Sequence, residues 1–233
     1  SFKNFYMKLF FLSIYFLLSF NLCTSQSIKL EMSKKNNAST SIILMIADGA
    51  GLSQITAAIY KNENKSHLES FKVVGLQKTH AVNSLITDSA ASGTAMACGT
   101  KTVNGAIGVD IENKPYESIL KICEKKGYNS GMIVTSSIVH ATPASFYANV
   151  FSRSEYQEIA FQLSKSEVDF FIGGGEKHFI KRNDKKNLIS EMKDWDFVNN
   201  LDEFDFDNNK IFIKPHEYEE DFYMCINITK EAD

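Results

Sequence analysis

Apolar residues recur along the middle of the chain in short blocks that switch between two spacings. Three continuous apolar runs have the length of strands: 41–47, 131–135 and 168–172. Runs of this kind are typical of strands buried on both faces of a parallel sheet. Three further segments repeat their apolar residues at helical spacing: 54–61, 115–126 and 154–165. Strands that alternate with helices predict an α/β fold, a three-layer sandwich with a central, mostly parallel sheet.

Weaker signals fill the remaining parts of the pattern. Residues 71–82 alternate faintly and predict extended structure. Pro115 fits the first turn of the helix expected over 115–126, and Gly127 can end that helix. Beyond residue 181 the chain becomes charged and rich in asparagine, and it predicts only a helix at 188–193 and a strand at 210–214. We treat 181–233 as a peripheral segment.

The N-terminus has the pattern of an export signal. Lys3 and Lys8 flank Met7, and an apolar run, LFFLSIYFLLSF, follows. The run is shorter than the roughly 20 residues that span a bilayer, so residues 1–25 are interpreted as a signal peptide and the protein as exported. A retained membrane anchor or lipidation at Cys23 is the alternative. Residues 26–40 are polar without a period and are expected to form a tether.

Composition narrows the class of protein. The 233 residues carry a net charge of −3 without a basic stripe, which argues against a nucleic-acid partner. Removal of the signal would leave three cysteines, Cys98, Cys123 and Cys225, which can form at most one pair within the chain. There is no C-x-x-C pair of the kind that binds zinc.

The stretch 87–110, TDSAASGTAMACGTKTVNGAIGVD, has the strongest chemical signal. Its run of small side chains would let a helix lie close to neighbouring backbone, and Asp88 or Ser89 can cap the start. A serine there faces unpaired amides and the positive end of the helix dipole, which suits phosphate or another anion. Taken alone, the stretch favours a capped, alanine-rich core helix over an anion site.

Two other stretches favour a functional site. The run 41–47 ends at Asp48, within Asp48-Gly49-Ala50-Gly51, and ligand sites of open α/β sheets gather at the carboxyl ends of strands. The segment 140–144, HATPA, precedes Arg153. Each residue has an ordinary structural explanation when taken alone. Asp48 fits a turn former and Thr142 a loop residue. His140 fits a hydrogen-bonded structural histidine, and Arg153 fits a partner in a surface ion pair.

Together these stretches resemble a known family. IILMIADGAGLSQITAA, TDSAASGTAMACGTKTVNGAIGVD and HATPASFYANVFSR are similar to three N-terminal motifs of alkaline phosphatase, in the same order, and VDFFIGGGEKHF also fits. The resemblance covers residues 41–180, the N-terminal half of the family's chain. It therefore implies an alkaline phosphatase-like α/β fold in an apparently truncated form.

The resemblance implies specific catalytic roles. Ser89 matches the nucleophile, which becomes phosphorylated and also ligates zinc. Arg153 matches the phosphate-binding arginine, and Asp88 matches the residue that orients this arginine. Metal coordination can activate a serine that has no neighbouring histidine in the sequence.

The resemblance also implies metal ligands. Asp48 matches the carboxylate shared between zinc and magnesium. The resemblance implies Ser89 as the second zinc ligand. Thr142 matches a magnesium ligand. His140 occupies a position near the magnesium site where family members carry either aspartate or histidine. The cofactors expected are therefore Zn²⁺ and Mg²⁺.

The expected function is hydrolysis of small phosphate monoesters, with homodimer formation possible by resemblance. The family's other zinc ligands, an aspartate with a histidine shortly after, an Asp-His pair and a late histidine, are not visible in this sequence, nor is the glutamate of the magnesium site. The chain has five histidines and no Asp-His pair. The alternative is therefore an inactive phosphate- or metal-binding remnant. A sulfatase or phosphodiesterase of the wider superfamily is a weaker alternative.

Overall fold

The computed structural model describes residues 41–193, 195–198, 211–213 and 223–226. The predicted signal peptide and tether lie outside the described residues. Within them, six strands form one sheet in the order β1-β6-β2-β3-β5-β4. The strands are β1 (Ile43–Ile46), β2 (Gly131–Ser137), β3 (Phe170–Gly174), β4 (Asp196–Val198), β5 (Ile211–Ile213) and β6 (Tyr223–Ile226).

Five of these strands run in one direction. β2 pairs with β3, β3 with β5 and β5 with β4 in parallel. β6 lies antiparallel between β1 and β2, so β1 and β2 point the same way. The predicted α/β fold with a mostly parallel sheet is thus confirmed. β6 falls in a stretch that no sequence pattern identified.

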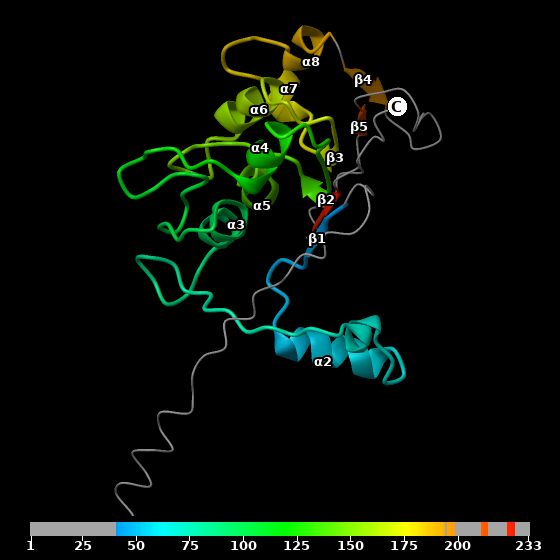
Figure 1. The fold of residues 1–233 in the computed structure, drawn as a ribbon. Coiled ribbons are helices and arrows are strands. Elements are labelled where there is room, and N and C mark those ends of the chain that lie inside the picture. The colour runs from blue at the N-terminus through cyan, green and yellow to red at the C-terminus, as the bar shows by residue number, and fades with distance from the viewer. Residues whose placement is uncertain (1–40, 194, 199–210, 214–222, 227–233) are drawn as a thin grey trace, which may run out of the picture. The chain divides into compact units, whose positions relative to one another are not determined.

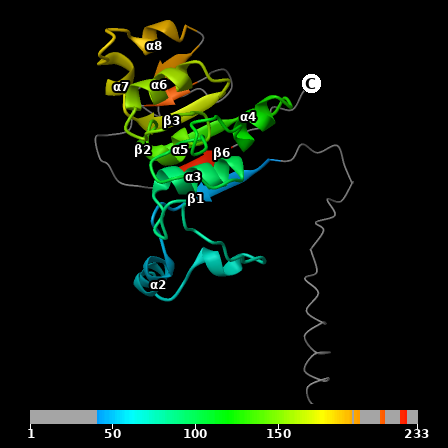
Figure 2. The ribbon, with the colours of Figure 1, turned by 90° about the vertical axis from the view of Figure 1, so that its left-hand side faces the viewer.

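The helices are α2 (Leu52–Lys61), the 3₁₀ helix η1 (His67–Ser70), α3 (Ser89–Cys98), α4 (Ile119–Glu124), α5 (Ala141–Ala144), α6 (Tyr156–Ser164), α7 (Lys177–Ile180) and α8 (Leu188–Glu191). Figure 1 shows α3 to α7 gathered along one face of the sheet, and Figure 2 looks onto that face. The core lies between this face and the helices. Met132 of β2, Phe171 of β3, and Ile159 and Leu163 of α6 are fully buried in it.

Helix α4 begins later than the sequence predicts. Pro115 does not enter the first turn, because it pairs with Val109 in an antiparallel bridge. The helix starts at Ile119, after Ser118. The Ser118 hydroxyl accepts a hydrogen bond from the Lys121 amide at 3.3 Å and donates one to the Phe146 carbonyl at 2.5 Å. The helix therefore begins at the residue after Ser118, whose buried hydroxyl both donates and accepts a hydrogen bond, and not at Pro115.

The prediction that 41–47 is buried on both faces is wrong. Three of the four residues of β1 are exposed, and Ile46 is only half-buried. Residues 71–82, expected to be extended, form no strand, and Leu76 is fully exposed. A continuous apolar run indicates that a strand is suited to burial on both faces. The described residues do not cover β1 in this way.

Two further features bear on the sequence expectations. Cys98 and Cys123 are free thiols. In the part of the chain that the structure describes, no helix combines the length and the apolar character that crossing a bilayer requires.

Candidate functional site

Helix α3 presents Ser89 at its first position. Asp88 is the N-cap, and its Oδ1 accepts a hydrogen bond from the Ala91 amide at 2.9 Å. The Ser92 hydroxyl donates to the Asp88 carbonyl at 2.8 Å. Ser89 is half-buried, whereas Ala90 and Ala91 behind it are buried. The serine oxygen therefore lies at the positive end of a ten-residue helix, as predicted from the capping pattern.

The small residues of α3 allow a close approach to α5. A Cβ added at Gly93 would lie 2.7 Å from the Ser145 Oγ and 3.3 Å from the Thr142 Cα. Any larger side chain at position 93 would push the two helices apart. The glycine therefore fixes the distance between the helix that carries Ser89 and the helix that carries Thr142.

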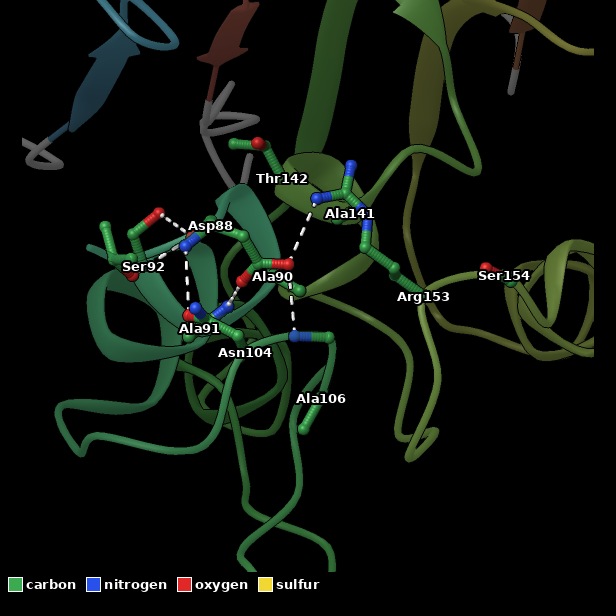
Figure 3. Close-up of polar contacts among 12 residues, drawn as sticks. Asp88, Ala90, Ala91, Ser92, Asn104, Ala106, Ala141, Thr142, Arg153 and Ser154 are labelled. Carbon is green, nitrogen blue, oxygen red and sulfur yellow. Dashed lines mark hydrogen bonds and ion pairs between the residues drawn. The ribbon is translucent and has the colours of Figure 1, made fainter. Parts of the chain in front are cut away.

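The carboxylate of Asp88 joins three segments of the chain. Its Oδ2 accepts hydrogen bonds from the Gly105 amide at 3.0 Å and from Arg153 Nη1 at 3.2 Å. Figure 3 shows Asp88 between the start of α3 and the Arg153 side chain. Both side chains of the ion pair are partly exposed, by 30% for Arg153 and 25% for Asp88, so the guanidinium keeps donors free for a ligand.

Asp48 and Thr142 meet although 94 positions separate them. The Thr142 hydroxyl donates to Asp48 Oδ2 at 3.3 Å, and Thr142 is 3% exposed. Asp48 lies two residues beyond Ile46, the last residue of β1, at the carboxyl end of the strand. A carboxylate and a hydroxyl side by side are oxygen donors of the kind that Mg²⁺ prefers. The residues present therefore fit part of a magnesium site.

One cavity of about 710 Å³ collects most of the predicted site residues. Asp48, Asp88, Ser89 and Arg153 all line it. The fold thus brings together side chains from three separate segments of the sequence, at position 48, positions 88–89 and position 153. A small anion inside the cavity would face a serine, a helix N-terminus and a guanidinium.

The opposite wall of the cavity comes from residues that the sequence did not indicate. Residues 77–81 line it together with Lys101. The Lys101 ammonium donates to the carbonyl of Lys78 at 3.2 Å and to that of His80 at 2.5 Å. These contacts hold the irregular 77–81 segment against the turn that follows α3.

His140 is placed differently from the other predicted ligands. It is the N-cap of α5, two residues before Thr142. The cavity lining includes neither His140 nor Thr142, but Thr142 contacts the lining residue Asp48. Its imidazole acts on His178: the pKa of His178 is lowered first by burial, then by the charges of Lys177 and His140.

Zinc has fewer partners in this site than magnesium. Across the residues that the structure describes, no three His, Cys, Asp or Glu side chains come together as a metal-binding group. Zinc sites in proteins commonly use four ligands rich in nitrogen and sulfur. Asp48 and Ser89 could supply two oxygen ligands, and the described residues add no third.

The combination defines a class: an α/β protein with a serine at the start of a helix, an arginine held by a carboxylate and an aspartate beyond the end of a strand. The sequence profile of the family described as "Alkaline phosphatase" matches residues 39–210. The chain therefore belongs to the alkaline phosphatase family.

Named relatives and solved structures agree with this membership. The chain is 38% identical over 128 residues to "Alkaline phosphatase" of Schizosaccharomyces pombe, covering 50% of this chain and 24% of the relative. It is 37% identical over 141 residues to the Escherichia coli "Alkaline phosphatase", covering 56% and 30%. The structure of the alkaline phosphatase from the Antarctic bacterium TAB5 superposes with a TM-score of 0.68 at 38% identity, over 72% of this chain and 51% of that one.

A mutant of the TAB5 enzyme, with a TM-score of 0.68 and 39% identity over 72% of this chain and 50% of that one, is described with Mg bound in its M3 site. The chain thus spans between a quarter and a half of the lengths of these relatives.

Proposed function

We propose that this chain carries the nucleophile and the phosphate-binding groups of a metal-dependent phosphate monoester hydrolase of the alkaline phosphatase type. The supporting observation is the convergence of Ser89, Arg153 and Asp48 on one cavity, with Asp88 holding the arginine. The proposal extends to small phosphate monoesters as substrates, to export directed by residues 1–25, and to homodimer formation.

The proposed reaction assigns a task to each residue. The Arg153 guanidinium binds two oxygens of the phosphoryl group while the amides at the start of α3 face a third. Ser89 Oγ attacks phosphorus as the ester P–O bond breaks. The hydroxyl releases its proton to water, and the departing alkoxide takes up a proton from water to leave as the alcohol. A water molecule then hydrolyses the phosphoserine and releases inorganic phosphate. Asp88 fixes the arginine throughout, so the phosphoryl group meets an ordered set of donors.

Zn²⁺ and Mg²⁺ would be held at the Asp48 side of the cavity. Asp48, Thr142 and Ser89 would contribute oxygen ligands, and His140 is the more distant candidate. When bound, such ions lower the pKa of the serine hydroxyl and neutralise charge on the attacking and leaving oxygens. The chain's own contribution is to place a carboxylate and a hydroxyl where those ions are needed.

The experiment compares the purified 233-residue chain with its Ser89→Ala variant, both supplied with Zn²⁺ and Mg²⁺. We expect the wild-type chain to hydrolyse a chromogenic phosphate monoester at alkaline pH and to form phosphoserine at position 89 detectable by mass spectrometry. The variant should lose both, because the hydroxyl that is proposed to attack phosphorus and to carry the phosphoryl group is removed. Equal turnover by the two proteins would contradict the proposal.

A second candidate is a phosphate- or metal-binding remnant without turnover. The scarcity of zinc ligands among the described residues favours it. In that case inorganic phosphate would bind and Arg153→Ala would weaken the binding, but neither phosphoserine nor product would form. Calorimetric titration with phosphate beside the turnover assay separates the two candidates.

A further inference from the structure

The side chain of Asn104 connects Asp88 and Ile86, which lie one and three residues before Ser89. Its Oδ1 accepts a hydrogen bond from the Asp88 amide at 3.0 Å, and its Nδ2 donates to the Ile86 carbonyl at 2.9 Å. Its own backbone amide donates to Asn83 Oδ1 at 3.0 Å. Asn104 is half-buried and does not line the cavity, so it acts on the cavity only through its neighbours.

The next residue links the same loop to the arginine. The Gly105 amide donates to Asp88 Oδ2 at 3.0 Å, and the Gly105 carbonyl accepts from the Arg153 amide at 2.7 Å. Gly105 has a φ of +88°, a conformation that glycine adopts at little cost. A single loop, Asn104-Gly105, therefore holds the main chain of Asp88, the carboxylate of Asp88 and the main chain of Arg153 (Figure 3).

We propose that Asn104 is a positioning residue that sets the separation between the Ser89 oxygen and the Arg153 guanidinium. The proposal rests on the proposed function for the identity of the anion, which is a phosphoryl group. Ser89 is bonded directly to Asp88, whose amide has Asn104 as its acceptor. Loss of that acceptor frees the N-cap residue to rotate and shifts Ser89 relative to Arg153, whose backbone amide still donates a hydrogen bond to the Gly105 carbonyl.

The physical basis is the steep dependence of rate on placement. The helix end and the arginine must contact the same phosphoryl group, so a displacement along the line between them weakens both sets of hydrogen bonds. A misplacement of about 1 Å can lower a rate by about a hundredfold. A residue with a purely structural role would instead lower the fraction of folded protein without changing the rate of each folded molecule.

The experiment uses the full chain with Zn²⁺ and Mg²⁺ and three variants. Asn104→Leu keeps the volume and removes both hydrogen bonds. Asn104→Asp keeps an acceptor for the Asp88 amide and loses only the donor to Ile86. Asn187→Leu is the matched control, because Asn187 Oδ1 likewise accepts a backbone amide, that of Ser190 at 3.2 Å, far along the chain at the start of α8.

Two quantities are measured for each protein: the affinity for inorganic phosphate by calorimetry, and turnover per phosphorylated Ser89 counted by mass spectrometry. We expect Asn104→Leu to lower turnover per labelled site by about 30- to 100-fold. Its phosphate affinity should fall by about tenfold, since a charge-assisted hydrogen bond contributes about 1.5 kcal/mol or more. Asn104→Asp should stay within about fivefold of wild type, because it loses one ordinary hydrogen bond. Asn187→Leu should change neither quantity per folded molecule.

Each outcome decides between the two proposals. Wild-type values for Asn104→Leu, or equal losses in all three variants, would overturn the positioning role alone. Phosphate binding without phosphorylation of Ser89 in the wild-type chain would overturn the proposed turnover, while the phosphate affinities of the two Asn104 variants still decide the positioning role. A wild-type chain that binds no phosphate would overturn both.

Discussion

Residues 41–86 and residues 87–192 differ sharply in how they bury their apolar side chains. Of the eighteen large apolar residues that are exposed, fourteen lie in 42–86. Of the twenty-five buried apolar residues, only Ala81 lies there. Helix α2 has no buried residue, whereas α6 buries Ile159, Ala160 and Leu163. Residues 87–192 therefore contain a packed core, whereas residues 41–86 expose apolar side chains of the kind that proteins usually bury.

This difference divides the candidate site in two. Four of the site residues belong to the packed region: Asp88, Ser89, Thr142 and Arg153. There Asp88 pairs with Arg153, and the close approach at Gly93 brings α3 against Thr142. Asp48 belongs to the other region, where it follows an exposed strand. The groups proposed to bind phosphate are therefore carried by the packed region, and the carboxylate proposed for the metals follows a strand with much less packing.

The largest expected effect is a contrast in stability between the two regions. Leu163→Ala removes a fully buried side chain from the core and should lower the free energy of unfolding by about 2–5 kcal/mol. Leu76→Ala removes a fully exposed side chain and should change it by less than about 0.5 kcal/mol. Urea unfolding of both variants checks the contrast. Equal losses would mean that residues 71–86 are packed in solution.

The next effect concerns the division of the site. Arg153→Ala should weaken inorganic phosphate binding by about 10- to 150-fold, the range expected for loss of hydrogen bonds to a charged ligand worth about 1.5–3 kcal/mol. Asp48→Asn, measured without metal ions, should leave phosphate affinity unchanged or raise it, because a carboxylate on the cavity wall repels an anion. Calorimetry on both variants tests the assignment. The reverse order of effects would refute the division of the site.

The smallest expected effect is a dependence of the free energy of unfolding on pH, caused by Glu124 in the packed region. Burial raises the pKa of Glu124 above its ordinary value, against the opposing hydrogen bond from the Ser130 hydroxyl. The folded state therefore holds this proton more tightly than the unfolded state, so the stabilisation is complete below the unfolded pKa and is lost as pH rises through the folded pKa.

Glu124→Gln removes this dependence. Urea unfolding at several values from about pH 4 to pH 8 should show the wild type losing stability relative to the variant as pH rises. An unchanged difference across that range would show that Glu124 is as well solvated in the folded chain as in the unfolded one. The residue lies on α4, away from the Ser89 cavity, so the assay leaves the site untouched.

Local signals located most elements and several site residues. The cap at Asp88, the helix over 89–98 and the strands at 131–137 and 170–174 follow from short-range preferences and apolar spacing that the chain carries in itself. The start of α4 was misplaced because a bridge to Val109 took Pro115 out of the helix. A pairing partner distant in sequence can override a local preference of this kind.

The role of the Asn104-Gly105 loop was accessible only in part. The dipeptide is a strong turn signal in any sequence. Nothing in it indicates that the asparagine oxygen accepts the Asp88 amide sixteen positions earlier. Likewise, α5 is four residues long, too short for a periodic pattern to reveal, although it holds Thr142 against Asp48.

The sequence by itself determined the α/β class, the resemblance to alkaline phosphatases and the residues around which the site is built, because motifs and periodicity are properties of neighbouring residues. Only the tertiary structure decided which of those residues meet: that Ser89, Arg153 and Asp48 share a cavity, that His140 does not line it, and that β1 is exposed. Contacts between distant segments depend on which surfaces are packed together in the folded chain, and that is a property of the whole molecule rather than of any one stretch.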